Sequence, residues 1–320
     1  MVKKIGVSAR MFHALPHLKD EIRAAYPDTE IVFGEPRAVY SAQEIIDFFA
    51  GCDAAVISLE RFTDDVLEKL PDLEVVACCS AGVDHIDPAV MKRRAIRVGW
   101  RPGVNRHAVA EMAVSLMIDL LRGISIYRRA MERDAVWPLA RTGRLLRGRT
   151  VGIHGCGNIG REVVQLLKPF GCTLLASDRA DIRGFCDAHG VEVVPPEELR
   201  ARSEVLTLHL PRNATTRGLY TAEALDQLMP GCLLVNTARG SIVDETALLE
   251  RLKDGRIAAA AFDVFDEEPV RDRNLLALSN FLVTPHIGGS AIEAMEGLGR
   301  SGMRGITDGT VPEPGVYPFD

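Results

Sequence analysis

Three side chains late in the chain could bind a carboxylic acid and transfer a proton to it, and each follows an apolar stretch. An arginine such as Arg239 can bind a carboxylate through two parallel hydrogen bonds. A histidine such as His286 can carry a proton, and a carboxylate beside it, here Glu268, stabilises its protonated form and orients the ring. Asp263 follows another apolar stretch at 258–262. Taken singly, Arg239 could form a surface ion pair and His286 could be structural; together the four residues predict a catalytic site.

A second group of residues has the spacing of a dinucleotide-binding turn. Gly155, Gly157 and Gly160 fit G-x-G-x-x-G directly after an apolar strand at 151–153. The first glycine allows a tight turn, the second lets backbone approach a pyrophosphate, and the third allows close helix–strand packing. The helix that follows presents its N-terminus to the anion. Asp178, at the end of the next strand, is placed to bind ribose hydroxyls. The alternative is a glycine-rich turn that binds no ligand.

The elements that position these residues alternate between short apolar strands and helices. In the first hundred residues we expect strands at 5–8, 30–33, 54–58, 73–79 and 97–99. Helices are expected at 15–25, at 41–50 with a Ser41–Glu44 capping box, and at 63–70 with Thr63 as N-cap. Buried strands separated by helices predict a parallel sheet that is covered on both faces.

The same alternation resumes after a break at 101–103, where Pro102 favours extended backbone. A long helix capped by Asn105 comes first and ends at Gly123. Strands are then expected at 151–153, 173–177, 192–194, 205–210, 233–236, 258–262 and 281–284. Helices are expected at 161–170, 197–201, 222–228 and 246–254, with a last helix at 291–304 that could return to the first domain. This pattern predicts a doubly wound parallel sheet of six strands or more.

Composition agrees with an ordinary globular protein. The chain has 320 residues, of which 47% are hydrophobic and 26% charged, with a net charge of −6. This charge disfavours nonspecific nucleic-acid binding. No apolar run is long enough for a membrane span, and the N-terminal apolar run is too short for a secretory signal. The seven cysteines are scattered without a C-x-x-C pair, which predicts reduced thiols, a cytoplasmic location and no zinc site.

The segment 105–149 predicts a subunit contact. Its long helix is apolar on more than one face, so we expect a second subunit to cover part of it in a homodimer. The later part, 122–149, is rich in arginine and poor in acids. A solvated arm or subunit contact is the preferred interpretation, and nucleic-acid binding is the alternative.

Together these motifs resemble the NAD-dependent D-isomer-specific 2-hydroxyacid dehydrogenases, which include phosphoglycerate, glycerate and hydroxypyruvate enzymes. The resemblance covers nearly the whole chain. Its carriers are Ser80-Ala81-Gly82-Val83-Asp84-His85-Ile86-Asp87, the glycine turn, His209-Leu210-Pro211 with Thr215-Thr216-Arg217-Gly218, Asn236-Thr237-Ala238-Arg239-Gly240, Asp263-Val264-Phe265-Asp266-Glu267-Glu268-Pro269 and Thr284-Pro285-His286-Ile287-Gly288-Gly289.

The resemblance implies a Rossmann-type domain at 101–287 carrying the dimerisation arm, and a smaller flavodoxin-like α/β substrate domain at 1–100 plus 288–320. It implies that Arg239 binds the substrate, that His286 is the acid/base and that Glu268 is its partner. The implied substrate-binding residues are Ala81, Gly82, Val83, Arg239 and His286. The implied NAD-binding residues are Gly155, Gly157, Asn158, Ile159, Gly160, Asp178, His209, Pro211, Thr216, Thr237, Ala238, Arg239, Asp263, His286, Gly288 and Gly289.

The implied activity is reversible hydride transfer between NAD(H) and a small 2-oxo or D-2-hydroxy acid of the phosphoglycerate or hydroxypyruvate/glyoxylate type. Substrate is expected between the two domains. NADP is the less favoured cofactor, although Arg179 beside Asp178 could accommodate its 2′-phosphate. Arg101 and Arg106 could bind a second anionic group or be surface residues. An NAD(H)-sensing binding protein or corepressor on the same fold is the alternative. A formate dehydrogenase is less favoured because that branch pairs its histidine with an amide.

Overall fold

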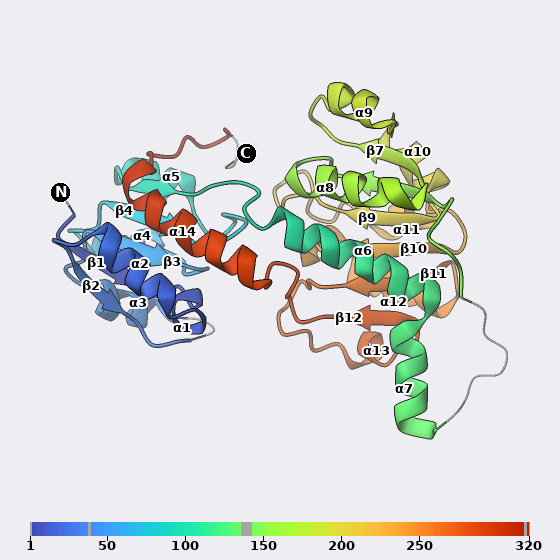
Figure 1. Cartoon of the computed structure of the whole chain (residues 1–320), viewed down its shortest axis with the longest axis horizontal. Helices are drawn as coiled ribbons and strands as arrows, with labels where there is room; N and C mark the ends of the chain where they lie inside the picture. The colour runs from blue at the N-terminus through green and yellow to red at the C-terminus, as the bar shows by residue number, and fades with distance from the viewer. Residues whose placement is uncertain (1, 38–39, 136–142, 317–318, 320) are drawn as a thin grey trace. The chain divides into compact units, whose positions relative to one another are not determined.

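The computed structural model describes residues 2–37, 40–135, 143–316 and 319. These residues form two compact units (Figure 1). Residues 1–105 and 290–320 make the first unit, and residues 106–289 make the second. The chain therefore leaves the first unit once and returns to it at the end. The limits fall near the boundaries expected at 100/101 and 287/288; the roles of the two domains stay predictions.

The first unit is built on a five-stranded parallel sheet in the order β2-β1-β3-β4-β5. This is the flavodoxin-like order 2-1-3-4-5, as the resemblance implied. The strands are short and largely buried because both faces are covered. Their bounds are Lys4–Val7 for β1, Glu30–Phe33 for β2, Ala54–Ile57 for β3, Val75–Cys78 for β4 and Arg97–Gly99 for β5.

Successive side chains of each strand enter two different cores. In β3, Ala54 and Val56 belong to one core with helices α1, α2 and α14, whereas Ala55 and Ile57 belong to the other with α3, α4 and α5. This alternation follows from the two-residue period of a strand. The helices span Met11–Ala14 (α1), His17–Ala25 (α2), Ala42–Phe49 (α3), Asp64–Glu68 (α4), Pro88–Arg93 (α5) and Ile292–Asp308 (α14).

Helix α14 belongs to the first unit, where the sequence placed a last helix that could return to the first domain. It lies against β3, β4 and β5 (Figure 1). Glycine permits this close packing: a Cβ atom on Gly302 would stand 2.2 Å from the sulfur of Cys79, and one on Gly99 would stand 2.2 Å from the carbonyl oxygen of Gly305. The last helix is therefore an integral part of the first unit.

The second unit is built on a seven-stranded parallel sheet in the order β12-β11-β10-β9-β6-β7-β8. The chain winds outward from β6 in one direction and from β9 in the other, as in a doubly wound Rossmann-type sheet. The strands span Thr150–His154 (β6), Thr173–Ser177 (β7), Glu192–Val193 (β8), Val205–Leu208 (β9), Cys232–Asn236 (β10), Ile257–Phe262 (β11) and Phe281–Val283 (β12). The predicted two-domain α/β architecture is confirmed.

Helices cover both faces of this sheet. Residues of α6, α8 and α9 line one core, and residues of α10, α11, α12 and α13 line the other. The helices span Arg106–Arg122 (α6), Ile124–Asp134 (α7), Asn158–Leu167 (α8), Arg183–His189 (α9), Pro196–Arg202 (α10), Ala222–Asp226 (α11), Glu245–Lys253 (α12) and Arg273–Leu276 (α13), with 3₁₀ turns η1 at Lys168–Phe170 and η2 at Gly240–Ile242.

The structure corrects several predicted helix bounds. The helix expected at 161–170 begins three residues earlier, at Asn158, directly after Gly157, and its last three residues form η1 around Pro169. A proline cannot donate the α-helical hydrogen bond, which accounts for the tighter last turn. The helix expected at 15–25 begins two residues later, at His17, as α2, and a separate short helix, α1, precedes it at Met11–Ala14. The predicted Ser41 capping box and Thr63 cap are both confirmed.

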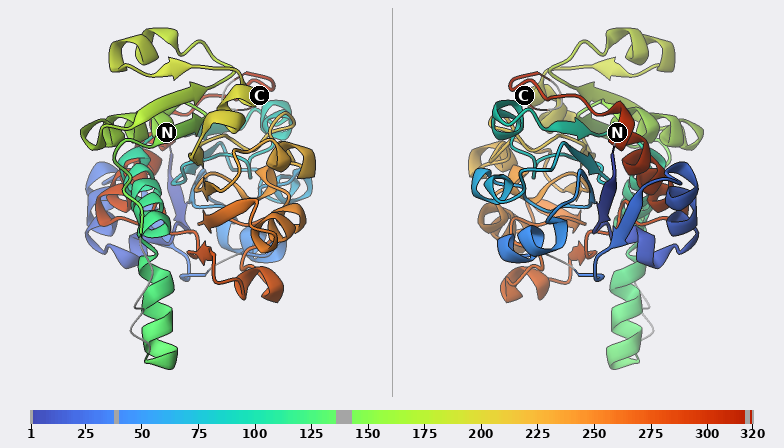
Figure 2. Two further views of the ribbon diagram at one scale, coloured as in Figure 1. Left: turned by 90° about the vertical axis from the view of Figure 1, so that its right-hand side faces the viewer. Right: turned by 90° about the vertical axis from the view of Figure 1, so that its left-hand side faces the viewer.

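A second subunit was expected to cover part of the long apolar helix, but helix α6 is covered within its own unit. Its apolar residues pack against α8, β10 and β11. The exposed apolar side chains of this region lie beyond it, at Ile124 and Met131 on α7 and at Leu145. In both views of Figure 2, α7 extends away from the sheet of its unit. Part of the expected contact segment, 136–142, lies outside the described residues.

No helix in the described part of the chain combines the length and apolar character needed to cross a membrane.

Candidate active site

The glycine turn follows β6 at the point where the strand order reverses. Gly155 has φ +93°, a conformation that favours glycine, and a Cβ atom there would lie 2.6 Å from the carbonyl oxygen of His209. His209 itself follows β9, and its N–H donates to the carbonyl of His154 at 2.8 Å. The turn is therefore closed against the neighbouring strand at the switch point, where open α/β sheets bind ligands.

Gly160 and Gly157 have different environments in this turn. A Cβ atom on Gly160 would stand 2.1 Å from the carbonyl oxygen of Gly155, so packing requires glycine there. Gly157 precedes α8 and has φ −79°, and among the described residues no atom lies within 4 Å of the position that its Cβ would take. Packing within the chain does not explain this glycine. The open space beside the first N–H groups of α8 fits an approaching pyrophosphate.

Asp178 holds the turn in place. Its Oδ2 accepts a hydrogen bond from the N–H of Cys156 at 2.7 Å, and its Oδ1 accepts one from the N–H of Ala180 at 2.8 Å. The carboxylate therefore joins the end of β7 to the glycine turn. Each oxygen keeps a further lone pair that a ribose hydroxyl could use.

The remaining expected NAD-binding residues follow other strands at the same edge of the sheet. Thr237 and Ala238 follow β10, Asp263 follows β11, and the segment from His286 to Gly289 follows β12. Thr216 Oγ1 donates to the carbonyl of Pro211 at 2.6 Å. The hydroxyl of Thr237 and Nδ1 of His209 are buried and have no hydrogen-bond partner within the described residues. Unpaired buried polar atoms beside an open turn fit a dinucleotide that would supply partners.

Arg239 is positioned by Asn236 at the end of β10. The fully buried Asn236 side chain accepts from the N–H of Ala238 at 3.0 Å and donates to the carbonyl of Arg239 at 2.9 Å. A Cβ atom on Gly240 would lie 1.8 Å from the carbonyl carbon of Phe265. This close approach brings the Arg239 segment against the loop that carries Glu268.

His286 and Glu268 form a direct hydrogen bond. Nδ1 of His286 lies 2.7 Å from Oε2 of Glu268, and the second carboxylate oxygen accepts from the N–H of Phe265 at 3.1 Å. Burial acts to raise the pKa of Glu268, but these two hydrogen bonds and the charges of His286 and Arg239 together leave the pKa below its usual value. Glu268 is therefore kept ionised beside the imidazole, whose other nitrogen remains for a substrate.

Asp263 organises the loop that carries His286. Its Oδ1 accepts from the hydroxyl of Thr284 at 2.6 Å and from the N–H of Ile287 at 2.9 Å. Its Oδ2 accepts from the N–H of Gly288 at 2.8 Å, and a Cβ atom on Gly288 would stand 2.9 Å from that oxygen. These bonds hold His286 at φ 53°, which is uncommon for a residue other than glycine. Asp263 thus sets the imidazole in place.

Sequence analysis missed the supporting roles of Asn236, Glu245 and His154. Oε1 of Glu245 accepts from the N–H of Asp266 at 2.7 Å, which fixes the loop before Glu268, and burial raises the pKa of this carboxyl. Nδ1 of His154, at the end of β6, lies 2.6 Å from the hydroxyl of Tyr220, and burial lowers the pKa of His154 to about 4. Only Asn236 carried a sequence signal, as an asparagine at a strand end.

The expected substrate residues Ala81, Gly82 and Val83 belong to the first unit, whereas Arg239 and His286 belong to the second. Ser80 Oγ donates to the carbonyl of Gly82 at 2.8 Å. The two arginines considered for a second anionic group have carboxylate neighbours. Nη2 of Arg101 lies 2.8 Å from Oδ2 of Asp308, and Nε of Arg106 lies 3.8 Å from Oε2 of Glu162.

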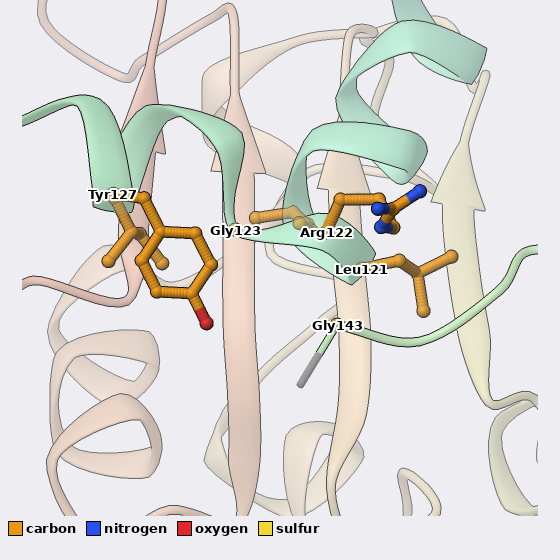
Figure 3. A pocket seen from close by; sticks show the side chains of 7 residues that line it. Leu121, Arg122, Gly123, Tyr127 and Gly143 are labelled. Carbon is orange, nitrogen blue, oxygen red and sulfur yellow. The ribbon is translucent and has the colours of Figure 1, made fainter. Parts of the chain in front are cut away.

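Two cavities lie elsewhere in the second unit. One of about 160 Å³ lies at the junction of α6 and α7, beside Arg122, Tyr127 and Gly143 (Figure 3). Another of about 430 Å³ is lined by Arg217, Ser241 and Asp266, among others. Within the described residues, no three histidine, cysteine or acidic side chains are grouped to hold a metal ion.

Comparison with known families decides what this arrangement is. Residues 114–288 match the family described as D-isomer specific 2-hydroxyacid dehydrogenase, NAD binding domain. The chain belongs to this family. The matched range contains the glycine turn and all four strand-end residues, so the cofactor of the second unit is NAD.

Similar proteins agree with this assignment. D-3-phosphoglycerate dehydrogenase of Methanocaldococcus jannaschii is 36% identical over 260 residues, which cover 80% of this chain and 49% of the relative. The chain thus spans about half the length of that relative. Hydroxypyruvate reductase of Thermotoga maritima is 35% identical over 260 residues, covering 80% of this chain and 84% of the relative. The structure of D-lactate dehydrogenase from Escherichia coli superimposes with a TM-score of 0.80 at 28% identity, covering 95% of this chain and 96% of that one.

Proposed function

We propose that the protein is an NAD-dependent oxidoreductase that interconverts a small 2-oxo acid and its D-2-hydroxy acid. The hydrogen bond of 2.7 Å between His286 and Glu268 carries this proposal. It lies in the same unit as the dinucleotide turn and beside Arg239, so a proton donor, an anion-binding group and a hydride carrier share one sheet edge. The names of the two similar relatives support a substrate of the phosphoglycerate or hydroxypyruvate/glyoxylate type.

The residues of the site bind the carboxylate and transfer the proton in this proposal. NADH supplies the hydride for the keto carbon. His286, protonated and held by Glu268, donates a proton to the oxygen as negative charge develops on it. Arg239 binds the carboxylate and stabilises the same developing charge. The backbone N–H groups of Ala81, Gly82 and Val83 hold the carboxylate, as a backbone nest binds an anion. In oxidation the neutral imidazole accepts the proton instead.

Turnover with a panel of 2-oxo acids tests this proposal. We expect NADH oxidation with at least one of glyoxylate, hydroxypyruvate, phosphohydroxypyruvate, pyruvate or a branched 2-oxo acid. An NAD(H)-sensing binding protein would bind NADH and reduce none of these acids. Formate oxidation without 2-oxo acid reduction would favour the formate dehydrogenase branch instead.

The same assay tests cofactor preference. Asp178 would pair with the adenosine ribose hydroxyls and repel a 2′-phosphate. We therefore expect a higher kcat/KM with NADH than with NADPH. Equal or better efficiency with NADPH would show that Arg179 overrides the carboxylate.

We further propose a homodimer in which α7 forms part of the contact. Ile124 and Met131 lie seven residues apart, about two turns, and therefore share one face of α7. Their side chains are 56% and 49% exposed there. Replacing both with arginine should dissociate the dimer in sedimentation equilibrium. Met229→Arg, at another exposed apolar position of the same unit, is the matched control and should leave the dimer intact. A wild-type monomer at micromolar concentration would overturn this assembly.

A cytoplasmic location is supported by the cysteines. All seven are free, and all except Cys172 are buried. Free thiols are kept in reducing compartments. In the arginine-rich segment, Arg128 pairs with Glu132 and Arg129 donates to the carbonyl of Phe281, so both guanidinium groups have partners within the chain, which disfavours nucleic-acid binding.

A further inference from the structure

Trp100 has an unexpected contact with the loop that follows β4 in the first unit. Its indole Nε1–H donates to two successive carbonyls, to Ser80 at 3.1 Å and to Ala81 at 3.2 Å. The ring also packs against the apolar core beneath α3, α4 and α5. One side chain at the end of β5 therefore holds the backbone of a neighbouring loop.

The carbonyl groups of residues 80–83 in this loop all accept hydrogen bonds. Besides the two bonds from Trp100, the hydroxyl of Ser80 donates to the carbonyl of Gly82 at 2.8 Å, and the N–H of Ile86 donates to that of Val83 at 2.9 Å. In the described part of the chain, no acceptor is found for the N–H groups of Ala81, Gly82 and Val83. Four satisfied carbonyls beside three unsatisfied N–H groups are the features of a backbone site that binds an anion.

We propose that Trp100 is a positioning residue for the substrate carboxylate. It fixes two peptide groups of the loop, and so keeps the N–H groups of Ala81, Gly82 and Val83 ready to bind the anion. This inference rests on the proposed function, because the anion is the carboxylate of the 2-oxo acid. A pre-formed set of donors binds the carboxylate in the ground state and in the transition state alike, so its loss acts mainly on KM.

The variant Trp100→Phe tests the proposal because it removes the Nε1–H donor and keeps an aromatic ring, smaller than the indole, against the core. We expect KM for the 2-oxo acid to rise about three- to tenfold, the range for one backbone hydrogen bond, with kcat nearly unchanged. The carboxamide analogue of the same 2-oxo acid has no anion to bind, so its kcat/KM should be equal in the two proteins. Ser80→Ala removes the other loop bond and should also raise KM, which covers the case that Trp100→Phe does not fold.

Tyr40→Phe is the matched control. It removes an aromatic donor to a backbone carbonyl, that of Glu35, in the same core but away from the loop. It should leave KM unchanged. An unchanged KM in Trp100→Phe would overturn the proposal while the proposed function stands. So would a loss of kcat as large as the rise in KM, together with an equal loss of kcat/KM for the carboxamide. A wild-type protein that reduces no 2-oxo acid would overturn both, and the panel of substrates shows which has failed.

Discussion

At the scale of residues, the site depends on side chains that hold other side chains. Asp263 uses both carboxylate oxygens to fix the loop of His286, and Asn236 fixes the turn of Arg239. The sequence indicated the four residues at strand ends because parallel strands end at one edge. It could not indicate that Asp263 binds the loop at 286–288, because that contact joins residues far apart in the chain and has no local pattern.

Arg239→Ala should remove most activity and leave NADH binding intact. The loss of a charge-assisted contact in the transition state should cost about 2–4 kcal/mol in kcat/KM, by analogy with the loss of an oxyanion donor. Arg239→Lys keeps the charge without the planar fork and should be intermediate. NADH fluorescence titration measures the affinity for the cofactor. Loss of NADH affinity with surviving turnover would show that Arg239 serves the cofactor instead.

At the scale of elements, strands were predicted better than helices. Buried parallel strands have a strong apolar signal, and the strand order confirmed both sheets. Helix α9 was missed because it is a short segment, Arg183–His189, with a glycine and one buried residue. Helix α7 was missed because it is rich in charged residues and lies largely exposed. The early start of α8 was missed because its first turn contains the glycine motif, whose conformation depends on packing against His209.

The start of α8 allows a sharp test of the dinucleotide turn. Gly157→Ala meets no atom in the described structure and no positive φ, so the free energy of unfolding should change by less than about 1 kcal/mol. The added methyl group would occupy the space expected for the pyrophosphate, so NADH affinity should fall at least tenfold. Gly184→Ala, on α9, also has open space and should change neither quantity. Undiminished NADH affinity in Gly157→Ala would place the pyrophosphate elsewhere.

At the scale of the whole molecule, buried neutral histidines make stability depend on pH. Burial lowers the pKa of His154 from 6.5 to about 4, and that of His209 to about 3. A histidine whose pKa is lower in the folded state stabilises the fold fully above its unfolded value. That contribution is lost as the pH falls from about 6.5 to about 4, where the unfolded chain binds the proton more readily.

His154→Asn removes this titration and keeps a polar partner for the hydroxyl of Tyr220. Between pH 6.5 and 4 the wild-type protein should lose on the order of 3 kcal/mol more unfolding free energy than the variant. Denaturant unfolding at a series of pH values measures the difference, and all other titrating groups are common to both proteins. Parallel curves over this range would contradict a buried, neutral His154.

The central claim is that Glu268 and His286 act as one acid/base pair, and the pH dependence of kcat/KM for 2-oxo acid reduction tests it most directly. Glu268→Gln keeps the shape of the side chain and removes the charge that favours the imidazolium. The profile should therefore move to lower pH, with activity retained in acid. Glu267→Gln, at the neighbouring exposed acid that pairs with Arg271, should leave it unchanged. An unshifted profile in Glu268→Gln would contradict the account.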